Sequence, residues 1–230
     1  MESTPAAVRA VALIPAFNEA ATVGAVVTGV RGLVSQVLVV DDGSTDATAA
    51  AARAAGADVI VHERNLGKGR AVRTGLARVF DGDFTHVVLL DADMQHLPAE
   101  AARLLAVAEA TGADVVIGER QFRRDEMPAS RYHTNRIGSW ALSSFVGAPI
   151  SDTQCGFRVF RVGALRPIAL HATGYEIETE MLIKVRRRGG HVTSAPVTAV
   201  YAGQRSKLRP VRDTTRTCFL AVYYRFIERL

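Results

Sequence analysis

The chain has 230 residues, of which 48% are hydrophobic and 22% are charged, so it can bury a substantial core. This composition excludes extended disorder and collagen-like repeats. The net charge of +5 is unevenly distributed, because residues 1–118 carry 9 Lys/Arg against 14 Asp/Glu whereas residues 119–230 carry 19 against 9. The basic second half favours an anionic partner, such as nucleotide phosphates, a phosphorylated substrate or a lipid surface.

The sequence shows no sign of membrane spanning or secretion. No apolar run reaches the about 18–20 residues that cross a bilayer. The N-terminus lacks the basic segment and apolar stretch of a secretory signal. The two cysteines, Cys155 and Cys218, provide neither a disulfide framework nor a zinc-site pattern. We therefore expect a cytoplasmic protein.

The first half alternates short apolar runs with amphipathic stretches. The runs predict strands over residues 8–14, 37–40, 59–61, 87–90 and 115–117. The intervening stretches predict helices over residues 19–31, about 67–80 and 97–110. A further helix is predicted after residue 44 or 45, with Ser44 or Thr45 as its cap. Continuous apolar strands between amphipathic helices are typical of an α/β fold, a Rossmann-like, mostly parallel central sheet flanked by helices.

The pattern changes after residue 118. An arginine-rich, polar loop is expected over residues 119–136, and helices are expected over residues 134–146 and 177–188. A strand is expected near residues 192–200, followed by a basic segment over residues 203–216. The tail from Asp213 repeats apolar residues at spacings of three and four, which predicts an amphipathic helix.

The carboxyl ends of the predicted strands hold the polar residues of interest, because ligands of open α/β sheets bind there. These are residues 15–19, 41–42, 65–68 and 91–95. Asp91-Ala92-Asp93 is the main metal candidate, since Mg²⁺ and Mn²⁺ prefer oxygen ligands and use one or two carboxylates together with substrate phosphates. A second Asp-x-Asp, Asp81-Gly82-Asp83, precedes its strand and is interpreted as a turn.

Each of these motifs also has a purely structural interpretation. Asp41 to Ser44 can be a turn followed by a helix cap, and Asn18-Glu19 can be capping residues. Lys68 is not part of a Walker loop and, taken alone, is a loop lysine. Arg186 to Arg188 are interpreted as a solvated helix end. The order of the motifs, rather than any one of them, carries the functional interpretation.

That order closely resembles the family 2 glycosyltransferases of the GT-A (nucleotide-diphospho-sugar transferase) fold. The resemblance is to the branch of dolichyl-phosphate mannose and glucose synthases and bacterial polyprenyl-phosphate glycosyltransferases. The matching segments are collinear over about residues 8–210 and comprise residues 14–19, 39–46, 65–69, 91–96, 118–120, 152–158 and 206–208. The resemblance implies a catalytic domain over residues 1–212, with a nucleotide-sugar half (8–118) and an acceptor half (119–212). The amphipathic helix predicted from the apolar spacing then forms the C-terminal segment over residues 213–230.

The resemblance also implies roles for individual residues. A pocket for the nucleobase and ribose is implied for Pro15, Phe17, Glu19, Val40 and Asp42. The wider nucleotide-sugar site adds Asp41, Lys68, Asp91, Ala92, Asp93, Arg205 and Lys207. The metal ligands implied are Asp91, Asp93 and Gln95. The acceptor phosphate is assigned to Arg120, Arg131 and Asn135. The residues with implied catalytic roles are Asp91, Asp93, Arg120 and Arg131.

The function implied is transfer of a hexose from GDP-mannose or UDP-glucose to a polyprenyl or dolichyl phosphate, with inversion and with Mg²⁺ or Mn²⁺. A bound divalent metal stabilises the charge of the leaving diphosphate. A lipid phosphate is already ionised at pH 7, so it needs no general base, and arginines position it beside the diphosphate. The basic second half is then explained without nucleic acid, and we expect the protein to lie peripherally at the cytoplasmic face of the membrane.

Three alternatives stay open at this point. A soluble transferase could use a small-molecule acceptor, such as a phosphoglycerate or a natural product. A sugar-nucleotidyltransferase shares a nucleotide-binding α/β fold, but it usually has a glycine- and lysine-rich loop where Pro15 to Glu19 stand. The third alternative is a non-catalytic nucleotide-binding module. The Gln-x-x-Arg-Trp signature of processive synthases is absent, which argues against chain elongation.

Deleting residues 217–230 should reduce binding to liposomes, because the predicted tail places Arg216, Arg225 and Arg229 beside aromatic residues, as interfacial helices do. Liposome cosedimentation measures the effect, and circular dichroism checks the fold of the shortened chain. Unchanged binding by a folded variant contradicts this interpretation of the tail.

Overall fold

Seven strands form one sheet in the order β3-β2-β1-β4-β6-β5-β7 in the computed structural model, which describes residues 8–120, 152 and 155–200. The strands are β1 (Ala10–Ala16), β2 (Gln36–Asp41), β3 (Asp58–Val61), β4 (His86–Leu89), β5 (Val115–Arg120), β6 (Arg158–Arg161) and β7 (Val192–Val197). Six of them run in one direction, and β6 is antiparallel to its neighbours β4 and β5. The prediction of a mostly parallel sheet is confirmed.

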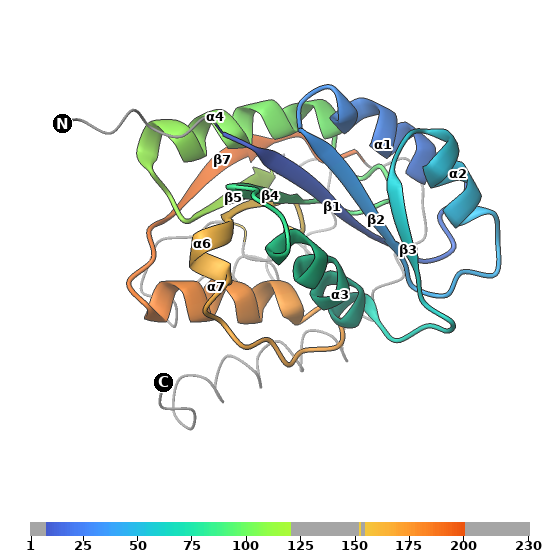
Figure 1. Cartoon of the computed structure of the whole chain (residues 1–230). Helices are drawn as coiled ribbons and strands as arrows, with labels where there is room; N and C mark the ends of the chain where they lie inside the picture. The colour runs from blue at the N-terminus through green and yellow to red at the C-terminus, as the bar shows by residue number, and fades with distance from the viewer. Residues whose placement is uncertain (1–7, 121–151, 153–154, 201–230) are drawn as a thin grey trace, which may run out of the picture.

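Helices cover both faces of the sheet (Figure 1). One face carries α1 (Val23–Arg31), α2 (Thr48–Ala54), the short 3₁₀ helix η1 (Pro98–Glu100) and α4 (Ala101–Thr111). The other face carries α3 (Lys68–Phe80), α6 (Val162–Leu165) and α7 (Ile177–Arg187). Each strand of the sheet's centre is therefore covered on both sides, which explains why β1 and β4 are entirely buried.

The apolar spacing in the sequence explains this packing. In α1 the valines at positions 23, 26, 27 and 30 recur at helical spacing and are all buried. In β1 every residue from Ala10 to Ala16 is buried, as expected for a strand between two layers. The edge strand β3 is different, because Asp58 and Val61 are exposed. The core therefore lies on both faces of the sheet's centre and thins toward β3.

Several element boundaries differ from the predictions. β1 extends to Ala16 because Pro15 and Ala16 pair with Val40 and Asp41 of β2, and β5 extends to Arg120 by pairing with β7. The first helix begins at Val23 rather than residue 19. The predicted cap at Ser44 or Thr45 is wrong, since α2 begins at Thr48 and the Asp46 carboxylate accepts the Thr48 N–H at 3.0 Å.

The described part of the second half completes the same sheet. β6 lies between β4 and β5, and β7 lies beside β5. The predicted helix near 177–188 corresponds to α7, and the strand near 192–200 ends at Val197. The predicted helix over 134–146, the basic segment over 203–216 and the tail over 213–230 lie outside the described residues, as does most of the loop over 119–136. No helix in the described ranges has the length and apolar character needed to cross a membrane.

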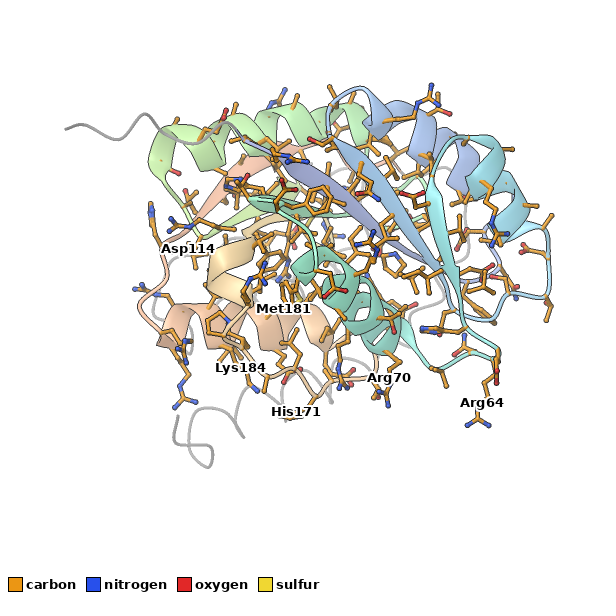
Figure 2. All side chains as sticks on the ribbon, viewed as in Figure 1. Arg64, Arg70, Asp114, His171, Met181 and Lys184 are labelled. Carbon is orange, nitrogen blue, oxygen red and sulfur yellow. The ribbon has the colours of Figure 1, made fainter. Side chains whose placement is uncertain are left out.

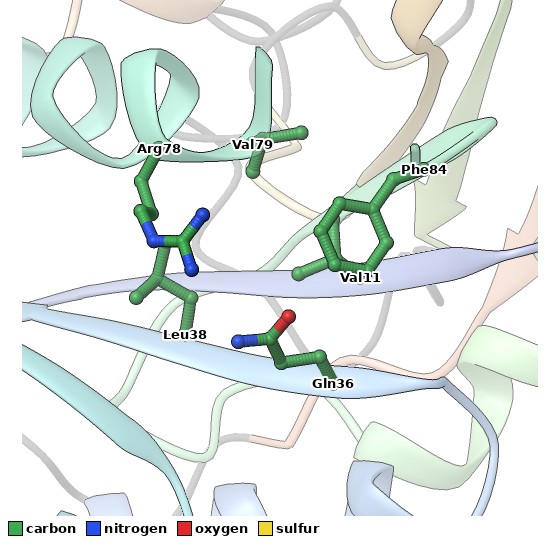
Figure 3. A pocket seen from close by; sticks show the side chains of 6 residues that line it. All are labelled: Val11, Gln36, Leu38, Arg78, Val79 and Phe84. Atoms are coloured by element: carbon green, nitrogen blue, oxygen red, sulfur yellow. The ribbon is translucent and has the colours of Figure 1, made fainter. Parts of the chain in front are cut away.

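The amino ends of β1 and β2 offer no room for a ligand. A narrow gap between α3 and these strands is lined by Val11, Gln36, Leu38, Arg78, Val79 and Phe84 (Figure 3), and it is too narrow to admit a water molecule. At this end Asp81 directly follows α3, and the Asp83 carboxylate pairs with Arg9. The interpretation of Asp81-Gly82-Asp83 as a turn is therefore confirmed.

A buried ion pair attaches the segment before α7 to the rest of the fold. The Lys184 ammonium lies 3.1 Å from the Glu180 carboxylate, and both side chains are almost completely buried. Glu180 also accepts the N–H groups of His171 and Ala172, while Lys184 donates to the Ala169 carbonyl at 2.8 Å. Figure 2 shows Lys184 and His171 on the face of the sheet that α7 covers. The segment over residues 169–172, which α7 holds in this way, packs against the start of α3.

Changing Gly69 to alanine should destabilise the fold by about 1–3 kcal/mol, as overpacking does. A Cβ there would lie 2.6 Å from the Ala172 carbonyl oxygen and 2.7 Å from the carbonyl carbon of Thr173, both backbone atoms that the α7 contacts hold in place. Thermal denaturation measures the loss, at about 2–4 °C per kcal/mol for a chain of this size.

Gly163→Ala is the matched control, because Gly163 also lies in a helix and nothing is within 4 Å of its added Cβ. We expect this variant to be neutral or slightly stabilised. Equal melting temperatures for the two variants would contradict the packing argument.

Candidate active site

The loops after β1 and β2 are joined by hydrogen bonds. The Asn18 N–H donates to Ser44 Oγ at 2.8 Å, and the Thr45 N–H donates to Asn18 Oδ1 at 2.8 Å. The Glu19 N–H donates to Thr48 Oγ1 at 2.8 Å. Asn18 has a φ of 51°, an uncommon backbone conformation for a residue other than glycine. Asn18 and Ser44 therefore connect two loops, which differs from the capping roles considered from sequence.

The residues assigned to the nucleobase and ribose lie together at the ends of these two strands, but not all are accessible. Pro15 and Val40 are neighbours in the register of β1 and β2 and are buried. Phe17 and Glu19 are half-buried in the loop that follows β1. Asp42 is buried and accepts hydrogen bonds from within the protein. The structure therefore leaves Phe17 and Glu19 as the more accessible side chains of this set.

Asp41 and Asp42 each bind backbone N–H groups. Asp41 Oδ1 accepts the Ser44 N–H at 2.9 Å. Asp42 Oδ1 accepts the Leu66 N–H at 3.0 Å, and Asp42 Oδ2 accepts the Gly67 N–H at 2.7 Å. Both side chains are buried, so these bonds compensate for the loss of hydration.

Lys68 is the first residue of α3 and joins two carboxylates. Its ammonium lies 2.5 Å from Asp91 Oδ1 and 2.6 Å from Glu178 Oε1, and it lies 5.3 Å from the centre of the Tyr175 ring. Burial alone would lower the pKa of Lys68, but the two carboxylates outweigh burial and raise it above its ordinary value. Lys68 is therefore a fixed cation at the strand ends, and its interpretation as an ordinary loop lysine is wrong.

The two aspartates after β4 are held differently. Burial would raise the pKa of Asp91, but the adjacent Lys68 lowers it, so Asp91 is a stable carboxylate. Burial and then the charge of Asp91 raise the pKa of Asp93 to about 6. Asp93 Oδ1 accepts the Gln95 N–H at 3.0 Å across Met94, which has a φ of 60°. Asp93 therefore carries negative charge that the surrounding protein only partly neutralises.

These oxygens fit a divalent cation whose shell is completed by substrate. Within the described ranges, no group of three or more His, Cys, Asp or Glu is arranged to hold a metal by itself. Mg²⁺ and Mn²⁺ sites commonly use one or two carboxylates and phosphate oxygens, so Asp91 and Asp93 are sufficient. Gly156 keeps the space above Asp91 open, since a Cβ there would lie 2.7 Å from Asp91 Oδ2 and 3.1 Å from Glu178 Oε1.

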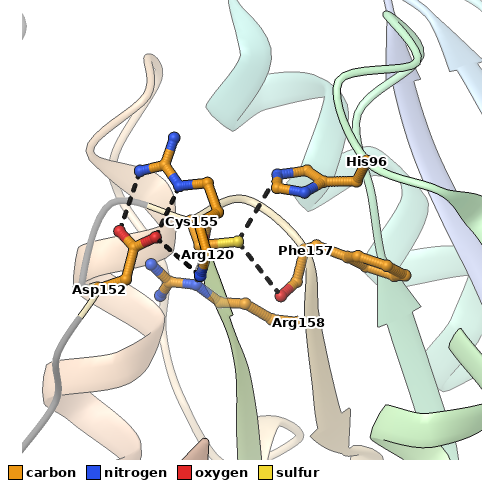
Figure 4. A network of polar contacts seen from close by, with 6 residues as sticks. All are labelled: His96, Arg120, Asp152, Cys155, Phe157 and Arg158. Atoms are coloured by element: carbon orange, nitrogen blue, oxygen red, sulfur yellow. Dashed lines mark hydrogen bonds and ion pairs between the residues drawn. The ribbon is translucent and has the colours of Figure 1, made fainter. Parts of the chain in front are cut away.

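Arg120, at the carboxyl end of β5, is paired with Asp152 (Figure 4). Its guanidinium donates to both carboxylate oxygens, at 2.6 and 2.9 Å, and its backbone N–H reaches Asp152 Oδ2 at 3.3 Å. This bidentate pair fixes the orientation of the guanidinium. Arg120 was assigned to the acceptor phosphate, and the structure places it at the same strand-end rim as Asp91.

Cys155 is not a nucleophile at this rim. Its Sγ lies 3.6 Å from His96 Nε2, and both side chains are buried (Figure 4). Burial raises the pKa of the Cys155 thiol to about 12, so the thiol stays protonated at neutral pH. Burial lowers the pKa of His96, against the opposing effect of Asp91. The pair therefore serves packing beneath the strand ends.

Sequence reasoning missed Glu178 and the buried arginine that fixes it. Arg158 is fully buried and donates to the carbonyl oxygens of Cys155 and Glu178, each at 2.7 Å. Glu178 lies in α7, where residues 177–185 are all buried regardless of polarity. An acidic residue among consecutive buried positions has no periodic signature, so only the fold reveals that it reaches Lys68.

Four of the assigned residues lie outside the described residues. They are Arg131, Asn135, Arg205 and Lys207. Their assignments to the acceptor phosphate and to the donor diphosphate stay predictions.

This arrangement of strands and aspartates defines a class of fold. A mostly parallel sheet with one reversed strand, and an Asp-x-Asp directly after β4, is the GT-A architecture of glycosyltransferases. The chain belongs to glycosyl transferase family 2, whose family model matches residues 11–168. It is therefore a glycosyltransferase, which confirms the family and the reaction class predicted from sequence.

Relatives by sequence carry consistent names. Glycosyltransferase AglJ of Haloferax volcanii is 34% identical over 220 residues, covering 93% of this chain and 70% of AglJ. The undecaprenyl-phosphate mannosyltransferase of Micrococcus luteus is 32% identical, with 84% of each chain covered. The polyprenol monophosphomannose synthase of Mycolicibacterium smegmatis is 31% identical, covering 83% of this chain and 77% of that synthase. These names support the polyprenyl-phosphate branch of the family.

Solved structures share the fold. Glucosyl-3-phosphoglycerate synthase from Mycobacterium tuberculosis, crystallised with Mn²⁺ and UDP-glucose, has a TM-score of 0.75 at 22% identity, covering 96% of this chain and 79% of that one. Mannosyl-3-phosphoglycerate synthase from Rubrobacter xylanophilus has a TM-score of 0.74 at 24% identity, covering 95% and 74%. At this level of identity the likeness establishes the fold.

Asp93→Asn should raise the melting temperature at pH 7 in the presence of a chelator, and the gain should shrink as the pH falls from about 6 to about 4. In the folded protein the pKa of Asp93 is about 6, above its ordinary value of 3.8. The folded state therefore holds a proton that the unfolded state has lost, so the wild type loses stability as the pH rises through this interval. Asparagine does not titrate and avoids that loss.

Asp81→Asn is the matched control, because Asp81 is exposed after α3 at the other end of the sheet. Melting curves of the three proteins between pH 4 and pH 7 make the comparison. A stability gain for Asp93→Asn that is the same at every pH contradicts the argument from charge.

Proposed function

We propose that this glycosyltransferase moves a hexose from a nucleotide-diphosphate sugar, GDP-mannose or UDP-glucose, to a polyprenyl phosphate, with Mg²⁺ or Mn²⁺ bound at Asp91 and Asp93. The observation that carries the proposal is the meeting of Lys68 with Asp91 directly after β4. It brings a cation and the carboxylate that we propose as a metal ligand to the edge of the sheet where ligands of α/β folds bind. The names of the sequence relatives support the lipid phosphate acceptor.

The donor diphosphate needs positive charge at its bridging and terminal oxygens. Lys68 supplies one cation, which Asp91 and Glu178 hold in place before the donor binds. A divalent metal, when bound, supplies Lewis-acid stabilisation of the charge that develops on the leaving diphosphate. Asp93 and Gln95 are the further residues proposed to hold it. Fixed charges of this kind act without reorganisation during the reaction, which is why they are effective.

The acceptor phosphate needs positioning rather than deprotonation. It is ionised at pH 7, so one of its oxygens attacks C1 of the hexose while the bond from C1 to the diphosphate oxygen breaks. A single displacement of this kind inverts the configuration at C1. Arg120, held by Asp152 at the end of β5, is proposed to orient the acceptor, together with Arg131 and Asn135. The basic character of the second half of the chain agrees with this role.

A small-molecule hydroxyl acceptor is the second candidate, and one observation favours it. A hydroxyl group needs a general base, and the buried Glu178 carboxylate lies beside Lys68 at the same rim. A phosphate acceptor gives Glu178 no proton to remove. Glu178 holds Lys68 under both candidates, so they differ in whether Glu178 must also act as a base.

Wild-type protein should transfer labelled hexose from one of a panel of nucleotide sugars into an organic-extractable lipid, in the presence of polyprenyl phosphate and Mg²⁺ or Mn²⁺. Asp93→Ala should reduce the rate by at least about 100-fold, the scale seen when one fixed stabiliser of developing charge is removed. Extraction and scintillation counting of the lipid phase measure the transfer.

Asp83→Ala is the matched control, since it removes an exposed aspartate from the other Asp-x-Asp and should leave the rate unchanged. Donor turnover that ignores the lipid phosphate contradicts the proposed acceptor and favours a small molecule. Failure to turn over any donor in the panel contradicts the proposed donor class.

A further inference from the structure

One position at the strand ends is shared by two carboxylates and is filled by an ammonium group. The Lys68 ammonium lies 2.5 Å from Asp91 Oδ1 and 2.6 Å from Glu178 Oε1. These are contact distances, so no second cation can lie between the same two oxygens. The side chains of Lys68 and Glu178 are 11% and 8% exposed, whereas that of Asp91 is 32% exposed. Asp91 therefore still presents part of its carboxylate to solvent.

The backbone holds Lys68 at this position from both sides. Gly67, which precedes it, has a φ of 96°, and its N–H donates to Asp42 Oδ2 at 2.7 Å. Gly69, which follows it, donates its N–H to the Thr173 carbonyl oxygen at 2.9 Å. The ammonium is therefore a fixed charge of the site rather than the end of a surface side chain that can move away.

The other oxygen of Asp91 opens onto a space that Glu178 also reaches. A Cβ added at Gly156 would lie 2.7 Å from Asp91 Oδ2 and 3.1 Å from Glu178 Oε1. Asp93 acts on the same region, since burial and then the charge of Asp91 raise its pKa to about 6. The negative charge of three carboxylates is thus concentrated here, and Lys68 contacts two of them.

A metal ion and the ammonium would compete for the charge of Asp91. A divalent cation bound to this carboxylate would lie only a few ångströms from the ammonium, because metal–oxygen contacts are short. Two positive charges that close together repel each other strongly in a partly buried site. A diphosphate reduces this repulsion, because its oxygens carry negative charge for both cations. An ammonium has three N–H donors, so Lys68 can serve a diphosphate oxygen while it stays with Asp91 and Glu178.

We infer that Lys68 is the internal counter-ion of the carboxylates proposed to bind the metal, so that a divalent metal binds weakly to the donor-free protein and tightly only together with a nucleoside diphosphate. The inference rests on the proposed function, because it needs a metal at Asp91 and a diphosphate donor. It adds to the role of Lys68 as a donor contact, since the same charge makes metal binding depend on the donor. The metal is then taken up with the donor diphosphate rather than before it.

Binding of Mn²⁺ without any nucleotide tests the inference directly. The signal of free Mn²⁺ in electron paramagnetic resonance measures the affinity at pH 7. Lys68→Met should bind Mn²⁺ at least about ten-fold more tightly than the wild type, because a positive charge a few ångströms from the metal is removed. Lys68→Arg keeps the charge and should stay close to the wild type. Arg70→Met is the matched control, since Arg70 is an exposed cation of the same helix and its loss should leave the affinity unchanged.

A double variant separates occupation of Asp91 from the net charge of the site. Lys68→Met with Glu178→Gln removes one positive and one negative charge, so the net charge equals that of the wild type. The affinity for Mn²⁺ should lie between those of the wild type and Lys68→Met, because Asp91 is freed from the ammonium. This variant also leaves no buried Glu178 carboxylate without its counter-ion, so it makes the comparison if Lys68→Met alone fails to fold by circular dichroism.

The dependence on the donor is measured by adding UDP, GDP or inorganic pyrophosphate. At least one of them should raise the affinity of the wild type for Mn²⁺ by about five-fold or more, and by reciprocity Mn²⁺ should raise the affinity for that ligand by the same factor. The factor should be smaller in Lys68→Met, whose metal site no longer needs the diphosphate to offset the ammonium.

The outcomes are distinct. Tight binding of Mn²⁺ by the wild type alone, or equal affinities of the wild type and Lys68→Met, overturns the inference. Wild-type affinity in the double variant also overturns it, because the metal would then respond to net charge only. Failure of the wild type to bind Mn²⁺ with any of the three diphosphates instead contradicts the proposed function.

Discussion

The repulsion among carboxylates at one edge of the sheet is the constraint on which the rest of the site depends. Parallel strands end at the same edge, so Asp41, Asp42 and Asp91 are brought together by the fold itself. One ammonium group, that of Lys68, compensates Asp91 and Glu178 at distances of 2.5 and 2.6 Å. Removing that cation would leave the buried Glu178 carboxylate and the half-buried Asp91 carboxylate without their shared counter-charge, which is more costly than losing a surface ion pair.

The other acidic groups at this edge are satisfied by backbone N–H groups and by arginine. Asp41 and Asp42 bind N–H groups of the loops that follow β2 and β3, and Asp152 binds Arg120. Each carboxylate therefore also orders a loop, and the loops form the site. Asp93 differs because, among the described residues, the hydrogen bond it accepts comes from the Gln95 N–H, two residues on, and because its pKa is elevated. The negative charge of the Asp93 carboxylate is therefore compensated mainly when a cation binds at this edge of the sheet.

The fold and the reaction class could be predicted from the sequence because their signals are local. The continuous apolar runs predicted the strands. The order of the motifs along the chain, with Asp-x-Asp among them, predicted the family. The partners of the charged groups could not be predicted, since they are distant in sequence. Glu178 reaches Lys68 across 110 positions of chain, and its helix is buried without any periodic pattern. The cap of α2 was mispredicted for a related reason, because Ser44 is used by the neighbouring loop at Asn18.

The reversed direction of β6 has a consequence for how the chain can vary. Since β6 runs against β4 and β5, its amino end lies at the edge where β5 finishes. The chain leaves the sheet after Arg120 and returns near Asp152, and these two residues are joined by a bidentate ion pair. The ion pair therefore ties the last residue of β5 to the approach to β6, so the end of one strand and the start of its antiparallel neighbour are held together by side chains as well as by the ladder. A substitution at either residue would release this end of the pair and leave the register of β1 to β4, in the donor half, unchanged.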